Sequence, residues 1–413
     1  MVSTLVIQTD QKDFVVNTAN LFIGSYANWL VRSNDVNVSN NIINYLGRYA
    51  QNPGTQTTTC KCLNKLAGKV PMDLKTIIQL YSSTNFDPKN AVVLVECVAK
   101  LISQCQDMKL VNEVLNYLLT VENAGIFTIF CEKLTALVQF LPANLVVEVI
   151  RHSWGNLAAA AERDTSNDTN LAEKVCRFYK HAVRATKALF EPFLNDLMTL
   201  LISLFTNKLK SPYLYAASIL ISEFPTAPNL RGMVHALSNV FFAKFTKLEQ
   251  FTLCPDILEE YFYLVGRAVA YAPNIIIGET KLFECILTAS ITGLQVMHKD
   301  AYKAIMVFQE NALDCKALPT SQAAVELLRR HCGNVVEVMC NNLANGMVLN
   351  LDGGSGSVCG VFFKNNRLFP SEFVEKLKSL NADVLVQGCA RGDRKDLHHA
   401  VRRFVDQHGG AKR

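Results

Sequence analysis

The chain has 413 residues, of which 50% are hydrophobic and 19% are charged, so its composition excludes an intrinsically disordered protein. This length exceeds what one compact core accommodates, and it predicts two or three domains or one extended repeat array. The formal net charge of +5 is mildly basic and does not by itself require a nucleic-acid partner.

Thirteen cysteines are scattered through apolar stretches such as "VECVAK" at residues 95–100. This usage predicts reduced core thiols in a cytosolic or nuclear protein. The first ten residues lack the basic start and the long apolar run of a secretory leader. The most apolar run, residues 197–205, is far shorter than the roughly 20 residues of a membrane span, so no membrane span is expected.

Almost every segment places its apolar residues at helical spacing, and almost none alternates apolar and polar residues as a strand does. The expected helices come in pairs. First helices begin near residues 12, 56, 88, 125, 170, 212, 255 and 299, and second helices near residues 35, 71, 108, 144, 189, 229, 278 and 320. Most spacings are close to the roughly 40–47 residues of HEAT-type repeats. The sequence therefore predicts an all-α fold, with an α-solenoid of paired antiparallel helices over residues 1–345.

The expected helix over residues 87–103 illustrates the signals. Asp87 can cap the helix, and Pro88 fits the first helical position, where no backbone N–H is needed. One apolar face follows, made by Ala91, Leu94, Val95, Val98, Leu101 and Ile102. Such a face must be buried against neighbouring helices.

The two ends are less regular than the repeats. Residues 346–360 include "LDGGSGS", which predicts a Gly-rich loop, and the rest of residues 346–413 is expected to form irregular C-terminal helices with a basic tail from residue 391. Residues 1–8 resemble the end of a second helix without its partner. Because no polar capping repeat is visible at either end, we expect the C-terminal portion of a longer protein.

No combination of residues predicts an enzyme, a cofactor or a metal site. The "GGSGS" stretch lacks the spacing and the preceding strand of a nucleophile elbow. Cys60 with Cys62, and His331 with Cys332, lack the second ligand pair that structural zinc usually requires. The sequence thus predicts a binding protein without catalysis or cofactor.

One segment carries a row of positive charge. On a helix, the basic residues of "EKVCRFYKHAVRATK" (173–187) fall within an arc of roughly 140°. Only Glu173 shares this face, although surface helices usually intersperse acids that pair with Lys and Arg. The row is either a solvated surface or a binding face for an anion, and composition leaves both open. The opposite arc is expected to be buried; it contains Val175, Phe178, Tyr179, Ala182, Val183 and Thr186.

Four segments carry a family resemblance, and they keep their order within residues 11–345. They are "ANLFIGSYANWL" (19–30), "SPYLYAASILISEF" (211–224), "CPDILEEYFYLVGRAVAYAP" (254–273) and "HKDAYKAIMVFQENAL" (298–313). They resemble, in turn, a helix with Ile-Gly and Trp, a Tyr-Leu-Tyr-x-x-Ser segment, a Pro-Asp-x-x-Glu-x-Phe helix and a helix that begins with His. Together these are typical of the importin-β superfamily of nuclear transport receptors, specifically its transportin-SR branch.

The resemblance implies a role for the basic row. In that branch an Arg-rich helix on the inner surface binds the Arg-Ser-rich domains of splicing factors, especially phosphorylated ones. Phosphoserine carries nearly two negative charges and three acceptor oxygens, which cationic side chains bind well. Lys replaces Arg at two positions, and Lys lacks the planar two-pronged guanidinium. The implied cargo-binding residues are Lys174, Arg177, Lys180, His181, Arg184 and Lys187.

The resemblance also implies the other partners of a transport receptor. These are nucleoporins and the Ran GTPase, whose main contacts would lie in repeats upstream of this chain, with shuttling between cytoplasm and nucleus. Residues after 350 match poorly, and nothing is transferred to them. The sequence therefore predicts a nuclear import receptor, or its cargo-binding C-terminal half, for Arg-Ser-rich or phosphorylated cargo. Two alternatives stay open: a protein-interaction scaffold without transport, and a solenoid that binds RNA through its basic helix and tail.

Overall fold

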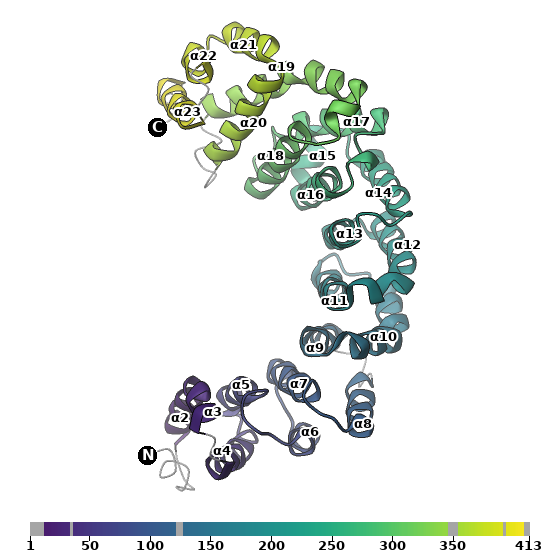
Figure 1. The fold of residues 1–413 in the computed structure, drawn as a ribbon, viewed down its shortest axis with the longest axis vertical. Coiled ribbons are helices and arrows are strands. Elements are labelled where there is room, and N and C mark those ends of the chain that lie inside the picture. Colours follow the sequence, from purple (N-terminus) through teal and green to yellow (C-terminus); the bar gives the residue numbers. More distant parts are fainter. Residues whose placement is uncertain (1–11, 34–35, 121–126, 346–353, 391–393, 409–413) are drawn as a thin grey trace. The chain divides into compact units, whose positions relative to one another are not determined.

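The computed structural model describes residues 12–33, 36–120, 127–345, 354–390 and 394–408, and most of these residues are helical (Figure 1). No β-strand occurs in these ranges. The prediction of an all-α fold built from paired helices is confirmed. The chain forms two compact units, Met1–Pro192 and Phe193–Arg413.

Two rows of helices build the first unit (Figure 1). Each helix of the first row packs on the next one in the row, and the second row packs against it. The short α3 (Ala27–Ser33) follows the first helix directly. The first row contains α2 (Asp13–Ser25), α5 (Gln56–Leu66), α7 (Pro88–Ile102), α9 (Phe127–Phe140) and α11 (Asn170–Thr186), and the second row contains α4 (Val36–Tyr49), α6 (Leu74–Ser83), α8 (Met108–Leu119) and α10 (Ala143–Arg163).

The second unit repeats the scheme after α12 (Glu191–Lys208). Its first row contains α13 (Ser211–Glu223), α16 (Pro255–Tyr271), α18 (Lys299–Leu313), α20 (Gly354–Leu368) and α23 (Arg394–His408). The other helices are α14 (Leu230–Lys244), the short α15 (Leu248–Leu253), α17 (Thr280–Gly293), α19 (Gln322–Ala344), α21 (Pro370–Ser379) and α22 (Asp383–Ala390).

The observed helix starts agree with the predicted ones to within three residues for both members of every pair. Local signals explain this agreement. The carboxylate of Asp87 accepts a hydrogen bond from the backbone N–H of Lys89 at 3.0 Å, with Pro88 in the first helical turn of α7. At α18, Nδ1 of His298 accepts from the N–H of Ala301 at 3.3 Å. These two helices therefore begin where a side chain can satisfy a first backbone donor.

The Gly-rich loop predicted for residues 346–360 is wrong over its second half. Helix α20 begins at Gly354, and residues 346–353 lie outside the described part of the chain, as do residues 1–8. The reason is packing: Val358, Cys359 and Phe362 are buried, and this burial outweighs the low helix propensity of glycine. Most of the predicted basic tail is helical too, as α23. The domain boundary near residue 345 stays a prediction.

One helical run, Asn170–Lys208, is long and apolar enough to cross a membrane, by length and composition only. The sequence alone predicts no membrane span, because the apolar run at residues 197–205 is too short for one. This run is interrupted between α11 and α12, where Lys187 adopts a φ of 48°. Many of its apolar side chains, among them Leu197, Leu201 and Phe205, are buried inside the fold. We therefore interpret the run as two solenoid helices joined by a bend.

All thirteen cysteines are free thiols, and most are buried. Burial raises the pKa of Cys60, Cys97 and Cys131 to about 12, so these thiols stay protonated at neutral pH. Protonated, buried thiols are poor nucleophiles and poor metal ligands, and these three act as small apolar core side chains.

A candidate binding face on α11

Helix α11 is held in the first unit by one apolar face. All six residues predicted for that face are buried, which confirms the helical assignment of residues 173–187 up to Thr186. The helix packs on α9 and on α10. The ring of Trp154, from α10, meets the ring of Tyr179 edge-on with centroids 5.4 Å apart. Because the apolar face is fixed on both neighbours, the basic face cannot turn inward.

Five of the six predicted binding residues lie on this remaining face, and Lys187 follows directly after α11, at its C-terminal end. Arg177, Arg184 and Lys187 are exposed, whereas Lys174, Lys180 and His181 are half-buried. From Lys174 to Lys187 the row covers roughly 20 Å along the axis, at about 1.5 Å per residue. Helix α11 thus places five of these side chains on one face, with Lys187 at its C-terminal end, and their role as ligands stays a prediction.

The basic face is less free of acids than the sequence of α11 indicates. Lys174 forms an ion pair with Glu132 of α9, and the two side chains are 20% and 27% exposed. Glu173 is the acid that α11 itself brings to this face, and the neighbouring α9 supplies a second carboxylate. Glu173 itself accepts a hydrogen bond from the hydroxyl of Thr169 at 2.5 Å. Lys174 is thus partly neutralised, whereas Arg177, Arg184 and Lys187 are exposed to solvent.

Helix α9 contributes two contacts that a reading of α11 alone misses. Besides the ion pair from Glu132, the side-chain amide of Gln139 lies 3.2 Å from Nε2 of His181. Gln139 and His181 are 42 residues apart, as are Glu132 and Lys174, and this is one repeat length. The signal was therefore present in the sequence: residues one repeat apart on consecutive first-row helices are neighbours.

His181 is surrounded by positive charge. Burial, followed by the charges of Lys180, Arg184 and Arg177, lowers the pKa of the His181 imidazole below its ordinary value of 6.5. His181 is therefore neutral at pH 7, where it acts as a hydrogen-bonding group rather than a cation. The side-chain N–H of Gln139 can donate to whichever ring nitrogen of His181 is unprotonated.

An NMR titration of the His181 ring should give a pKa below 6.5, and this pKa should rise when a phosphorylated peptide binds α11. The bound phosphate offsets the repulsion from the neighbouring cations and so favours the imidazolium. In the free protein, the lowered pKa of His181 affects stability. As the pH falls, the imidazole of the unfolded chain is protonated at a higher pH than that of the folded chain. The free energy of unfolding therefore decreases as the pH drops through 6.5. His181→Gln should remove this decrease in stability. The ring signal that is missing from the spectrum of this variant also identifies the resonance of His181. A pKa unchanged by the peptide would place His181 outside the binding face.

Comparisons with known proteins match this region. The profile of the Transportin-3/Importin-13 fourth TPR domain matches residues 144–248, which include all of α11. Transportin MOS14 from Arabidopsis thaliana is 24% identical over 151 residues, covering 36% of this chain and 16% of that protein. The matched α11 region therefore lies within a segment that transportin-type receptors share.

Solved structures agree on the fold. A structure of Importin13 in its cytosolic state superposes with a TM-score of 0.82 at 14% identity, covering 100% of this chain and 52% of that one. A structure of Importin Beta gives a TM-score of 0.57 at 13% identity, covering 98% of this chain and 52% of that chain. The chain thus spans about half the length of the receptors it matches. Residues 144–248 are thus similar to a transportin-3/importin-13 domain, part of the chain is similar to a transportin, and the fold is the helical solenoid of importin structures.

Proposed function

We propose that this chain is the cargo-binding part of a nuclear import receptor and that the basic face of α11 binds phosphorylated, Arg-Ser-rich protein cargo. The observation that carries the proposal is the row of cations on a helix whose other face is fully packed. The row lies inside the segment shared with transportin-type receptors. We also propose that the receptor binds Ran and nucleoporins and that it shuttles between cytoplasm and nucleus.

The dimensions and charge of the face suit such a cargo. An extended peptide rises about 3.3 Å per residue, so roughly six residues cover the roughly 20 Å row. In an Arg-Ser repeat, six residues contain three serines, and each phosphoserine carries nearly two negative charges. Arg177 and Arg184 provide the planar guanidinium groups that bind a phosphate with two parallel hydrogen bonds. The arginines of the cargo would remain outside, facing solvent or neighbouring acids.

The direct test is a titration of the purified chain against a fluorescent Arg-Ser repeat peptide, phosphorylated and unphosphorylated, at about 50 and about 200 mM salt. We expect binding of the phosphorylated form only, with an affinity that falls at the higher salt because exposed charges are screened. Equal binding of both forms, or of neither, would contradict the proposal.

The same titration separates the alternatives. A single-stranded RNA oligonucleotide that binds with a steep salt dependence, while phosphorylation of the peptide has no effect, would indicate the RNA-binding solenoid. Failure of both ligands would favour an interaction scaffold. In permeabilised cells, accumulation of labelled Arg-Ser cargo in the nucleus would then distinguish transport from binding alone.

A further inference from the structure

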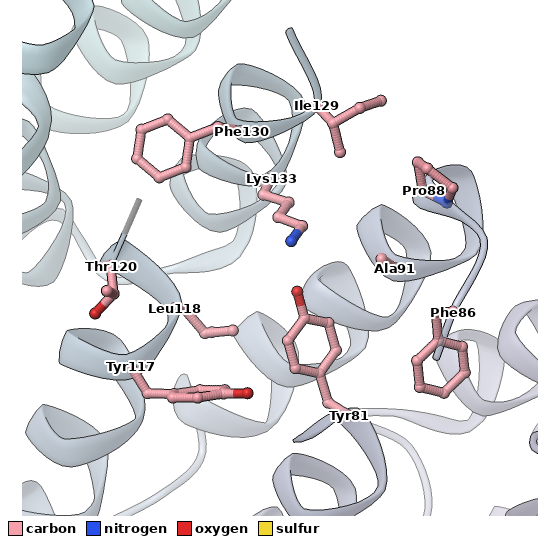
Figure 2. A pocket seen from close by; sticks show the side chains of 10 residues that line it. All are labelled: Tyr81, Phe86, Pro88, Ala91, Tyr117, Leu118, Thr120, Ile129, Phe130 and Lys133. Atoms are coloured by element: carbon pink, nitrogen blue, oxygen red, sulfur yellow. The ribbon is translucent and has the colours of Figure 1, made fainter. Parts of the chain in front are cut away.

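A pocket of about 190 Å³ opens within the first unit. Side chains from α6, α7, α8 and α9, and from the segment before α7, line it (Figure 2). None of its lining residues is among the six proposed for α11. It is therefore a separate site, and its chemistry can be considered independently.

Aromatic rings form one side of the pocket. The ring of Tyr81 stacks near Phe86 with centroids 6.3 Å apart and meets Tyr117 edge-on at the same distance. Tyr117 is 41% exposed, which is high for so large a side chain. Pro88 adds another flat, apolar surface. Such walls favour a planar apolar group, because rings gain stacking and edge-to-face contacts in addition to area burial.

A single positive charge lies among these rings. Nζ of Lys133 is 5.5 Å from the centroid of the Tyr81 ring, and the side chain is half-buried. Figure 2 shows Lys133 and the Tyr81 hydroxyl pointing toward each other across the pocket. None of the lining residues is acidic, and among the described residues Lys133 forms no ion pair. An ammonium and a phenol together offer donors to an anion that enters beside the rings.

We propose that this pocket binds a protein segment in which an aspartate or glutamate side chain lies next to an aromatic ring. The ring would pack against Tyr81, Phe86 and Tyr117, and the carboxylate would accept hydrogen bonds from Lys133 and Tyr81. A carboxylate fits better than a phosphate, because one ammonium balances one negative charge whereas phosphoserine carries nearly two. The partner is thus an acidic, aromatic peptide, in contrast to the phosphorylated cargo of α11.

The experiment is a fluorescence anisotropy titration of the whole chain with a labelled peptide, Ser-Gly-Asp-Phe-Asp-Gly-Ser-Gly, at low salt. Lys133→Met, which keeps the apolar stem, should lower the affinity about tenfold by removing a charge-assisted hydrogen bond. Tyr117→Ala should lower it by about the same factor through lost ring contact. The matched control is Lys109→Met, because Lys109 is an exposed lysine of α8 that does not line the pocket.

Three further peptides make the result decisive. Replacing Phe by Ala, or both Asp by Asn, should each abolish most of the binding, whereas phosphoserine in place of Asp should not improve it tenfold. The proposal is overturned if the parent peptide does not bind at millimolar concentration, or if the peptide without a ring or without charge binds equally well. It is also overturned if the phosphoserine peptide binds tenfold more tightly. The same holds if Lys109→Met weakens binding as much as Lys133→Met. Circular dichroism of each variant confirms its fold, and Lys133→Arg should retain binding.

Discussion

Replacing both Arg177 and Arg184 with glutamate should weaken binding of a phosphorylated Arg-Ser peptide by roughly 100-fold at low salt. Each arginine is exposed on the open face of α11, seven residues or about 10 Å apart along the helix axis. A charge-assisted hydrogen bond contributes about 1.5–3 kcal/mol, so losing two of them costs at least about 3 kcal/mol, equivalent to roughly two decades of affinity. Reversal of the charges adds repulsion toward the phosphates. Anisotropy titration of the wild type and the variant measures this ratio.

A matched variant controls for the change in net charge. Arg151 and Arg163 are exposed on α10, in the second row of the same unit, and their replacement by glutamate alters the charge by the same amount. Arg151 pairs with Glu148 at 2.6 Å, but an exposed pair of this kind contributes little to stability. If the α10 variant loses as much affinity as the α11 variant, the effect is long-range charge and α11 is not the cargo site.

The choice of these two arginines depends on the structure. From the sequence, Lys174, Arg177, Lys180 and Arg184 seem equivalent, because all four follow the helical period. In the fold, Lys174 is engaged by Glu132 of the preceding first-row helix. Reversal of Lys174 would therefore leave a half-buried carboxylate facing a second one, and the variant would lose stability as well as affinity.

The fold itself was predictable because the same signal recurs in every repeat. Apolar stripes recur along the chain, and several helices begin at a cap or a proline, as Asp87 and Pro88 show for α7. A solenoid requires little more than this, since each repeat contacts mainly its neighbours. The exception is α20, where glycines and serines predicted a loop. There, the burial of Val358, Cys359 and Phe362 decides the conformation, and burial is a tertiary effect that local propensity does not contain.

The candidate site was predictable in position but not in its electrostatics. The arc of α11 that faces outward follows from its apolar residues alone. The partner of Lys174 comes from α9, one repeat earlier in the chain, and the burial that lowers the pKa of His181 is a property of the folded chain. The pocket at Lys133 could not be found from sequence, because its walls come from α6, α7, α8 and α9, and no single motif joins them.

The core of the second unit should be far more sensitive than any of these surfaces. Phe308 of α18 is fully buried, and its ring lies 5.5 Å from that of Phe262 in α16 at 58°. The two helices approach closely here: a Cβ added to Gly266 would lie 3.6 Å from the Cα of Phe308. Phe308→Ala should therefore destabilise the unit by about 3–5 kcal/mol, since the close helices leave a cavity that cannot easily collapse.

Urea unfolding, followed by circular dichroism, tests this expectation by comparing Phe308→Ala with a substitution at the neighbouring Val307. Val307 is 36% exposed on the same helix, so Val307→Ala should change the free energy of unfolding by no more than about 0.5 kcal/mol. With an m-value of about 3 kcal/mol per M, Phe308→Ala should lower the midpoint of the second unit by about 1 M or more. Equal midpoints for the two variants would mean that α16 and α18 are not held together by this ring. Each repeat of a solenoid is stabilised mainly by its interfaces with adjacent repeats, so such a result would also remove the reason for expecting one rigid row of helices in this unit.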